Sequence, residues 1–241
     1  MSSQWKQMMW AGIMAGMLSA CHKHPVMPDM GSVNLAVNYE VDGAALIPDT
    51  MIYTNAAGNL YSVSRLEYYI SDVTFIAEDG ENHTDKRIQY ISAFSGPTNA
   101  WSIENIPAKN YTGITFLVGL NSDANKTGYL PPTMENVNMA WPDQMGGGYH
   151  FLKLEGHFMD SLNHMSGYAL HVGMASCLIT VSIEHPFTVK YKNQRMTLAM
   201  NINQWFGHPH IFDLDLVNYT MGNKPRMLEV AQNGSHAFTL R

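Results

Sequence analysis

The chain has 241 residues, with 14 lysines and arginines, 20 aspartates and glutamates, and a formal net charge of −6 at pH 7. Its basic residues are scattered and form no patch, which argues against a nucleic-acid-binding protein and against electrostatic docking on anionic lipid. Of the two cysteines, Cys177 alone falls in the expected folded domain, so packing and not a disulfide framework must hold the fold.

Residues 1–20 have the features of an export signal. One positive charge, Lys6, precedes an apolar run from Met8 to Met17, which has the length of a signal h-region and is too short to span a bilayer. The run ends in Leu18-Ser19-Ala20-Cys21, which resembles the bacterial lipobox. We therefore expect cleavage before Cys21, acylation of its thiol by chains such as palmitate, and membrane attachment without a transmembrane helix.

Residues 21–32 have the composition of a tether, with two prolines, a glycine and no apolar periodicity. No acidic run follows Cys21, and such a run marks surface export in some bacterial groups. By that analogy we expect the lipid anchor on the periplasmic side of an outer membrane. Residues 33–241 are long enough for one domain with a substantial core.

Apolar and polar residues alternate with a period of two in several segments, which is the pattern of half-buried β-strands. Turn signals punctuate the segments, and no stretch beyond the signal shows a long helical period. The pattern predicts an all-β fold, an antiparallel β-sandwich with long loops. The segments are Val33–Tyr39, Thr112–Val118, Ile179–Glu184 and Met196–Asn203; the turns are Asp42-Gly43, Asp79-Gly80 and Asn233-Gly234; Asp213 and Asp215 are expected on the solvated face of a further strand.

The densest cluster of unusual residues runs from Met139 to His171. Gly146-Gly147-Gly148 indicates a loop that bends sharply or approaches another group closely, because glycine lowers strand stability. A hairpin is expected after it, with strands Tyr149–Phe158 and Tyr168–Gly173.

In an antiparallel hairpin, the residue numbers of each pair that stands opposite across the strands add up to the same value. Pairing Phe158 with Asn163 across a four-residue loop places His150 opposite His171. The two imidazoles would then lie beside the glycine loop.

That loop carries Met139, Trp141 and Met145, so nitrogen, thioether and aromatic groups would gather around the two histidines. This set suits copper, as Cu⁺ or Cu²⁺. Zinc is less favoured, because no thiolate or carboxylate pattern accompanies the pair.

A plainer interpretation stays open, because a strand histidine is more often a hydrogen-bonded core or surface residue than a ligand. Alternation places His157 on the face opposite His150, and most methionines are explained as core filler. Cys177 is expected to be a buried small hydrophobe, with a copper thiolate as the alternative. Several other histidines are weaker candidates: His83 and His164 as solvated residues, His208-Pro209-His210 as a second-choice site, and His22 and His24 as nonspecific metal ligands.

The segments around the proposed site resemble the MbnP family of copper-binding proteins, in the lipoprotein form common in Bacteroidetes. The resemblance covers most of the mature chain, and its Lys-Leu-Glu-Gly and His-Val-Gly pieces are the more specific ones. The segments are Met139-Ala140-Trp141-Pro142, Gly148 to Gly156, Leu170-His171-Val172-Gly173, Leu66 to Ser71, Ile106-Pro107-Ala108 and Asn201 to Phe206.

The resemblance implies a β-rich extracytoplasmic protein that holds one copper through two histidines. In characterised members it also implies a tryptophan oxidised to kynurenine by diheme enzymes related to cytochrome c peroxidases, which are the implied partners. Carried to this chain, His171 is the best-matched ligand and Trp141 the best-matched tryptophan, whereas His150 rests on the hairpin pairing. A proline and the glycine loop stand where other members often have a second tryptophan, which puts the copper geometry in doubt.

The leading hypothesis is a copper-binding lipoprotein for acquisition, storage or delivery, and not an enzyme, since no catalytic triad, nucleophile elbow, paired-acid site or phosphate loop is present. The alternative is a metal-free binding module in which the glycine loop, Trp141, Tyr149 and Trp205 form a surface for a protein or glycan partner. An exported hydrolase would need an acid or hydroxyl coupled to one of the histidines, which the sequence does not reveal.

Overall fold

The structure is a computed structural model that describes residues 29–94 and 99–241. The expected export signal, Cys21 and most of the expected tether lie outside the described residues. The first strand, β1 (Met30–Val41), begins at Met30. Residues Met30 to Ser32, expected in the tether, are therefore part of the folded domain.

One sheet is built around β1 and β13 (Asn193–Asn201), which run parallel to each other. All other pairings between the described strands are antiparallel. The strand order is β14-β13-β1-β2, and β8 also pairs with β1. The further strands are β2 (Ala44–Ala45), β8 (Ala100–Pro107) and β14 (Phe238–Leu240).

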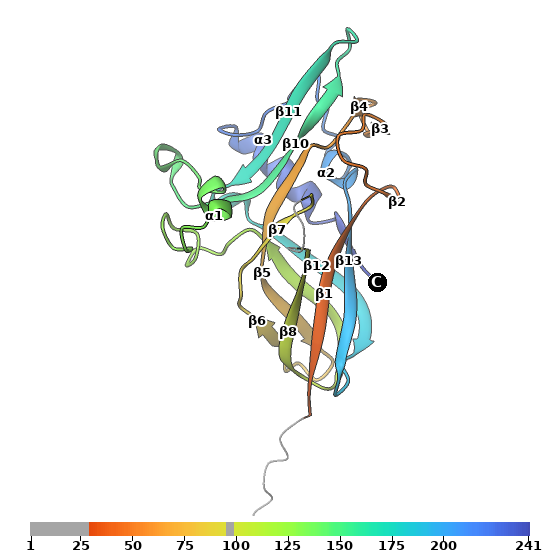
Figure 1. Ribbon diagram of the computed structural model, residues 1–241, viewed down its shortest axis with the longest axis vertical. Coiled ribbons are helices and arrows are strands. Elements are labelled where there is room, and N and C mark those ends of the chain that lie inside the picture. The colour runs from red at the N-terminus through yellow and green to blue at the C-terminus, as the bar shows by residue number, and fades with distance from the viewer. Residues whose placement is uncertain (1–28, 95–98) are drawn as a thin grey trace, which may run out of the picture.

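The second sheet has the order β12-β9-β5-β10-β4-β3, with β11 on β10 and with β6 and β7 on β5. Its long strands curl along the molecule (Figure 1), and the β10–β11 hairpin extends beyond the first sheet. Its members are β3 (Tyr53–Thr54), β4 (Leu60–Tyr61), β5 (Arg65–Ala77), β6 (His83–Asp85), β7 (Gln89–Ser92), β9 (Asn110–Val118), β10 (His150–Met159), β11 (Met165–Gly173) and β12 (Ile179–Thr188).

The core lies between the two sheets. Phe238 of β14 packs edge-on against Phe116 of β9 at a centroid distance of 5.1 Å and faces Tyr68 of β5 at 6.4 Å. The predicted alternation is confirmed, since β1 buries Val33, Leu35 and Val37 while the residues between them are half-buried. Full burial of each such aliphatic side chain stabilises the fold by about 1.5–3 kcal/mol. The all-β sandwich expected from the sequence is therefore confirmed.

The helices are short and were not predicted. The longest, α3 (Lys224–Gly234), occupies the segment in which the sequence indicated a turn at Asn233-Gly234, so that prediction was wrong. Asn223 caps α3 by accepting a hydrogen bond from the amide of Arg226. The buried residues Met227, Val230 and Ala231 follow helical spacing. The other helical segments are α1 (Met134–Asn138), α2 (Gln204–Gly207) and the 3-10 turns Asp143–Met145 and Ala175–Cys177.

The expected strand around Asp213 and Asp215 is also absent. The segment is a turn, and both carboxylates accept hydrogen bonds from the side-chain amide of Asn59 at 3.2 Å. In the described part of the chain, no helix has the length and apolar character needed to cross a membrane.

Candidate functional site

The expected hairpin is present, but its register differs from the prediction. Met159 pairs with Met165 and Lys153 with His171, so five residues, 160–164, form the loop instead of four. The predicted pairing of Phe158 with Asn163 was therefore wrong, and His150 does not stand opposite His171.

The two histidines nevertheless meet, because β10 is irregular between His150 and Leu152. This bulge pairs His150 with Gly173. Cross-strand partners share a face of the sheet, as do residues two apart in a strand, so His150 and His171 become diagonal neighbours. Their ring centroids are 5.1 Å apart, with the rings nearly perpendicular at 89°.

The hydrogen bonds of His150 assign its tautomer. The ring is 4% exposed, and its Nδ1 donates to the carbonyl oxygen of Met139 at 3.2 Å. Nε2 therefore carries a lone pair, and it is one of two buried side-chain nitrogens or oxygens without a hydrogen-bond partner among the described residues. A buried polar atom left unpaired costs about 1–3 kcal/mol and is uncommon in folded proteins.

Burial lowers the pKa of His150 to about 3, and the positive charge of Lys153 and the ring of His171 add to this effect. The backbone carbonyls of Met139 and Ala140 oppose the shift. The imidazole is therefore neutral at physiological pH, which is the form that binds metal ions.

His171 is held on both sides. Its Nε2 donates to a carboxylate oxygen of Glu155 at 2.8 Å, so the lone pair lies on Nδ1. Thr220 fixes the backbone of His171 with two hydrogen bonds of 2.7 Å. The hydrogen bond from His171 and the charge of Arg65, whose Nη1 lies 3.2 Å from Glu155, lower the pKa of the Glu155 carboxyl.

Lys153 ties the site to α1. Its ammonium group is buried and donates to the carbonyl of Asn138, the last residue of that helix. Burial and then the charge of Arg65 lower the pKa of Lys153. The Lys-Leu-Glu-Gly segment thus places two charged side chains at the site. Its last residue, Gly156, has to be a glycine because a Cβ there would lie 2.0 Å from the carbonyl oxygen of Ser62.

Trp141 packs on the ring of His150. Its indole is 2% exposed, lies 4.7 Å from the ring of His150 and donates from Nε1 to the carbonyl of Met145 at 3.2 Å. A Cβ on Gly173 would stand 2.5 Å from Cε3 of Trp141. The glycine of the His-Val-Gly piece therefore makes room for the indole.

The glycine loop holds Trp141 in place as the sequence indicated. All three glycines have positive φ, between 67° and 107°. A Cβ on Gly148 would lie 2.3 Å from the side chain of Asn125, and the carbonyl of Gly148 accepts the amide of Trp141 at 2.9 Å. Sharp turning and close approach both require glycine here.

Met139 is fully buried, and it contacts the site through its carbonyl oxygen, which accepts from both the ring and the amide of His150. Other candidate residues lie apart: His157 is exposed, the His164 side chain is 73% exposed, and His83 packs beside Phe75. Cys177 is buried, as predicted, and burial raises its pKa. Across residues 29–94 and 99–241, no group of three or more His, Cys, Asp or Glu is arranged to hold a metal ion.

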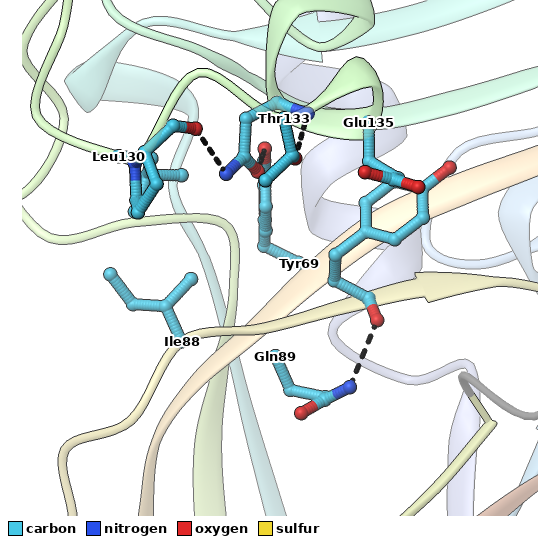
Figure 2. Close-up of a pocket in the computed structure, with 9 residues that line it drawn as sticks. Tyr69, Ile88, Gln89, Leu130, Thr133 and Glu135 are labelled. Atoms are coloured by element: carbon cyan, nitrogen blue, oxygen red, sulfur yellow. Dashed lines mark hydrogen bonds between the residues drawn. The ribbon is translucent and has the colours of Figure 1, made fainter.

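The aromatic surface expected for a metal-free binding module is not formed. Trp141, Tyr149 and Trp205 are all buried, at 2%, 4% and 0% exposure. A cavity of about 370 Å³ instead lies between α1 and β7, and its lining includes Tyr69 of β5 and Glu135 of α1 (Figure 2). Neither His150 nor His171 lines this cavity.

Fold and site together define a β-sandwich protein in which the buried, neutral imidazole of His150 meets the half-buried imidazole of His171 beside a tryptophan-bearing glycine loop. The family model for MbnP matches residues 30–223, and the chain belongs to the MbnP family. The structure of MbnP from Methylosinus trichosporium is similar, with a TM-score of 0.55 and 13% sequence identity over 88% of this chain and 98% of that chain. That likeness shows a shared fold. No curated protein matches this chain.

Proposed function

We propose that this protein binds copper outside the cytoplasm, for acquisition, storage or delivery, through the imidazoles of His150 and His171. The main support is Nε2 of His150, a buried lone pair without a partner in the described structure, on a ring that contacts His171. Such an atom has the chemistry of a metal ligand.

The donor set fits the metal. In each ring one nitrogen is occupied by an acceptor, the carbonyl of Met139 for His150 and the carboxylate of Glu155 for His171. Metal-binding histidines are commonly oriented in this way, which leaves the second nitrogen free to bind. Two imidazoles without a thiolate favour copper among the first-row metals. Copper when bound would supply redox or transfer chemistry that no side chain here provides.

We also propose that Trp141 can be converted to kynurenine by a diheme partner enzyme related to cytochrome c peroxidases. The reaction inserts two oxygen atoms across the indole C2–C3 bond as it breaks, and hydrolysis then releases C2 as formate. The peroxide-driven partner would supply the oxidising equivalents. The contact of Trp141 with His150 would place the new carbonyl and amine beside the imidazoles.

The remaining parts of the proposal concern location. A lipid on Cys21 would anchor the protein to the outer membrane on its periplasmic side. We propose a binding protein and not an enzyme, because the groups that contact His171, Glu155 and Thr220, are engaged in holding that residue in place.

Intact-protein mass spectrometry and metal analysis on native protein test the proposal together. We expect one copper per chain, a lipid mass on the peptide that begins at Cys21, and copper retained through dialysis. His150→Ala and His171→Ala should each release the copper, whereas the matched control His157→Ala on the same strand should keep it. Sub-stoichiometric copper in the native protein, or full retention in the double variant, would refute the assignment.

A second candidate, a metal-free binding module, is favoured only by the cavity beside α1, which offers Gln89 and Glu135 to a polar ligand. Ligand binding that survives chelation and depends on Tyr69 would support it.

A further inference from the structure

A second pair of histidines meets on the surface, between the ends of two helices that pack on each other. His208 follows α2 and His236 follows α3, and the ring centroids are 5.3 Å apart at an angle of 66°. Both residues are exposed. The sequence singled out His208 with His210, but His210 is hydrogen-bonded through Nε2 to the side chain of Gln232.

The two segments that carry the rings are fastened by Asn233, which is fully buried. Its side-chain amide donates to the carbonyls of Trp205 at 3.0 Å and His210 at 2.7 Å, and its oxygen accepts the amide of His210 at 2.8 Å. Gly234 packs so closely under Trp205 that a Cβ would lie 2.2 Å from that ring. The histidines are thus brought together by the fold and not by a mobile loop.

The spacing suits a shared metal ion. When two imidazoles bind one ion through metal–nitrogen bonds of about 2.0–2.1 Å, the distance between their ring centroids depends on the nitrogen–metal–nitrogen angle. The centroids are about 4.5 Å apart when that angle is a right angle, and about 6.3 Å apart when the two nitrogens lie on opposite sides of the ion. The observed 5.3 Å falls inside this range.

We propose that His208 and His236 form a second metal site, open to solvent, that binds a divalent transition-metal ion with water as the remaining ligands. Cu²⁺ should bind most tightly, following the usual order of affinity for nitrogen donors. Because both rings are exposed, the ion should exchange with solvent more readily than one held by buried His150 and half-buried His171. The inference does not rest on the function proposed for His150 and His171.

Titration with Cu²⁺ alone tests this, in full-length protein that carries His22→Ala, His24→Ala, His150→Ala and His171→Ala. Pulsed EPR should then detect two imidazoles on one Cu²⁺. Adding His208→Ala or His236→Ala should leave one imidazole and weaken binding on the order of 100-fold, because the second ligand of a chelate acts at high effective concentration.

The control is His210→Ala, which should leave both affinity and spectrum unchanged. Affinity unaffected by His236→Ala, or lost equally with His210→Ala, would overturn the proposal. If the background variant does not fold, the same substitutions are measured on the second equivalent of Cu²⁺ in protein with His150 and His171 intact. Persistence of that second equivalent without His236 would overturn the proposal as well.

Discussion

The indole of Trp141 lies directly on the backbone of Gly173, the cross-strand partner of His150. One glycine therefore sets the position of the tryptophan beside the imidazole of His150. The relationship also explains why a residue without a side chain follows His171-Val172 at the end of β11.

Replacing Gly173 with alanine should displace the indole, because the new methyl group would overlap Cε3 and neighbouring atoms of the ring. Overpacking of this kind costs about 1–3 kcal/mol. We expect a lower free energy of unfolding in urea and a changed tryptophan fluorescence spectrum. The control is Gly167→Ala in the same strand, where a Cβ would meet nothing closer than 3.8 Å; equal losses in both variants would contradict the explanation.

Glu155→Gln should weaken copper binding about 10–100-fold, since partners that orient a ligating histidine contribute that much to metal affinity. The substitution keeps the shape of the side chain but removes the charge that accepts the hydrogen bond from His171. Competition with a copper chelator measures the effect. Glu184→Gln, on the exposed face of β12, should leave affinity unchanged; an unaltered affinity in Glu155→Gln would show that His171 needs no such partner.

Acid should destabilise the metal-free protein partly through His150. The pKa of this residue falls from 6.5 to about 3 on folding, so below about pH 6.5 the unfolded chain takes up a proton that the folded state does not. Stability is therefore lost as pH falls from 6.5 toward 3, by about 3 kcal/mol at pH 4.5, because each pH unit in this range contributes about 1.4 kcal/mol. His150→Gln should reduce the difference in unfolding free energy between pH 7 and pH 4.5, and His157→Gln should not; equal pH dependence in all three proteins would exclude the effect.

Asn233→Ala should destabilise the fold strongly, because it removes the partner of three backbone groups. Each buried group left unpaired costs about 1–3 kcal/mol, so the loss should be at least about 2 kcal/mol. Gln232→Ala, its exposed neighbour, should change stability by less than about 0.5 kcal/mol. Thermal unfolding measures the stability of both variants. Similar melting temperatures would mean that Asn233 does not hold the segment of Trp205 and His210 in place.

The strands and the histidine pair could be predicted because alternation and the hairpin both leave direct marks in the sequence. The correct register could not, since it depends on a five-residue loop and on a bulge at His150, which a constant-sum pairing does not include. The predicted pairing was three residues away from the observed one, which on its own would have placed His150 and His171 on opposite faces of the hairpin. The bulge returns His150 to the face that carries His171.

The groups around the histidines were missed for a different reason. Glu155 and Lys153 lie in the Lys-Leu-Glu-Gly piece, which carried the family resemblance but had no assigned chemistry until the fold placed both side chains at the site. The alternative of a metal-free binding module required Trp205 and Tyr149 on the surface, yet both side chains are buried in the core. Helix α3 was not predicted because only three apolar residues, Met227, Val230 and Ala231, form its buried face.

Anomalous diffraction at the copper edge, from crystals of the copper-loaded protein, tests the central claim most directly. We predict the strongest peak between Nε2 of His150 and Nδ1 of His171, beside the side chain of Trp141. A copper peak elsewhere with this position empty, or copper bound without either nitrogen, would contradict the assignment.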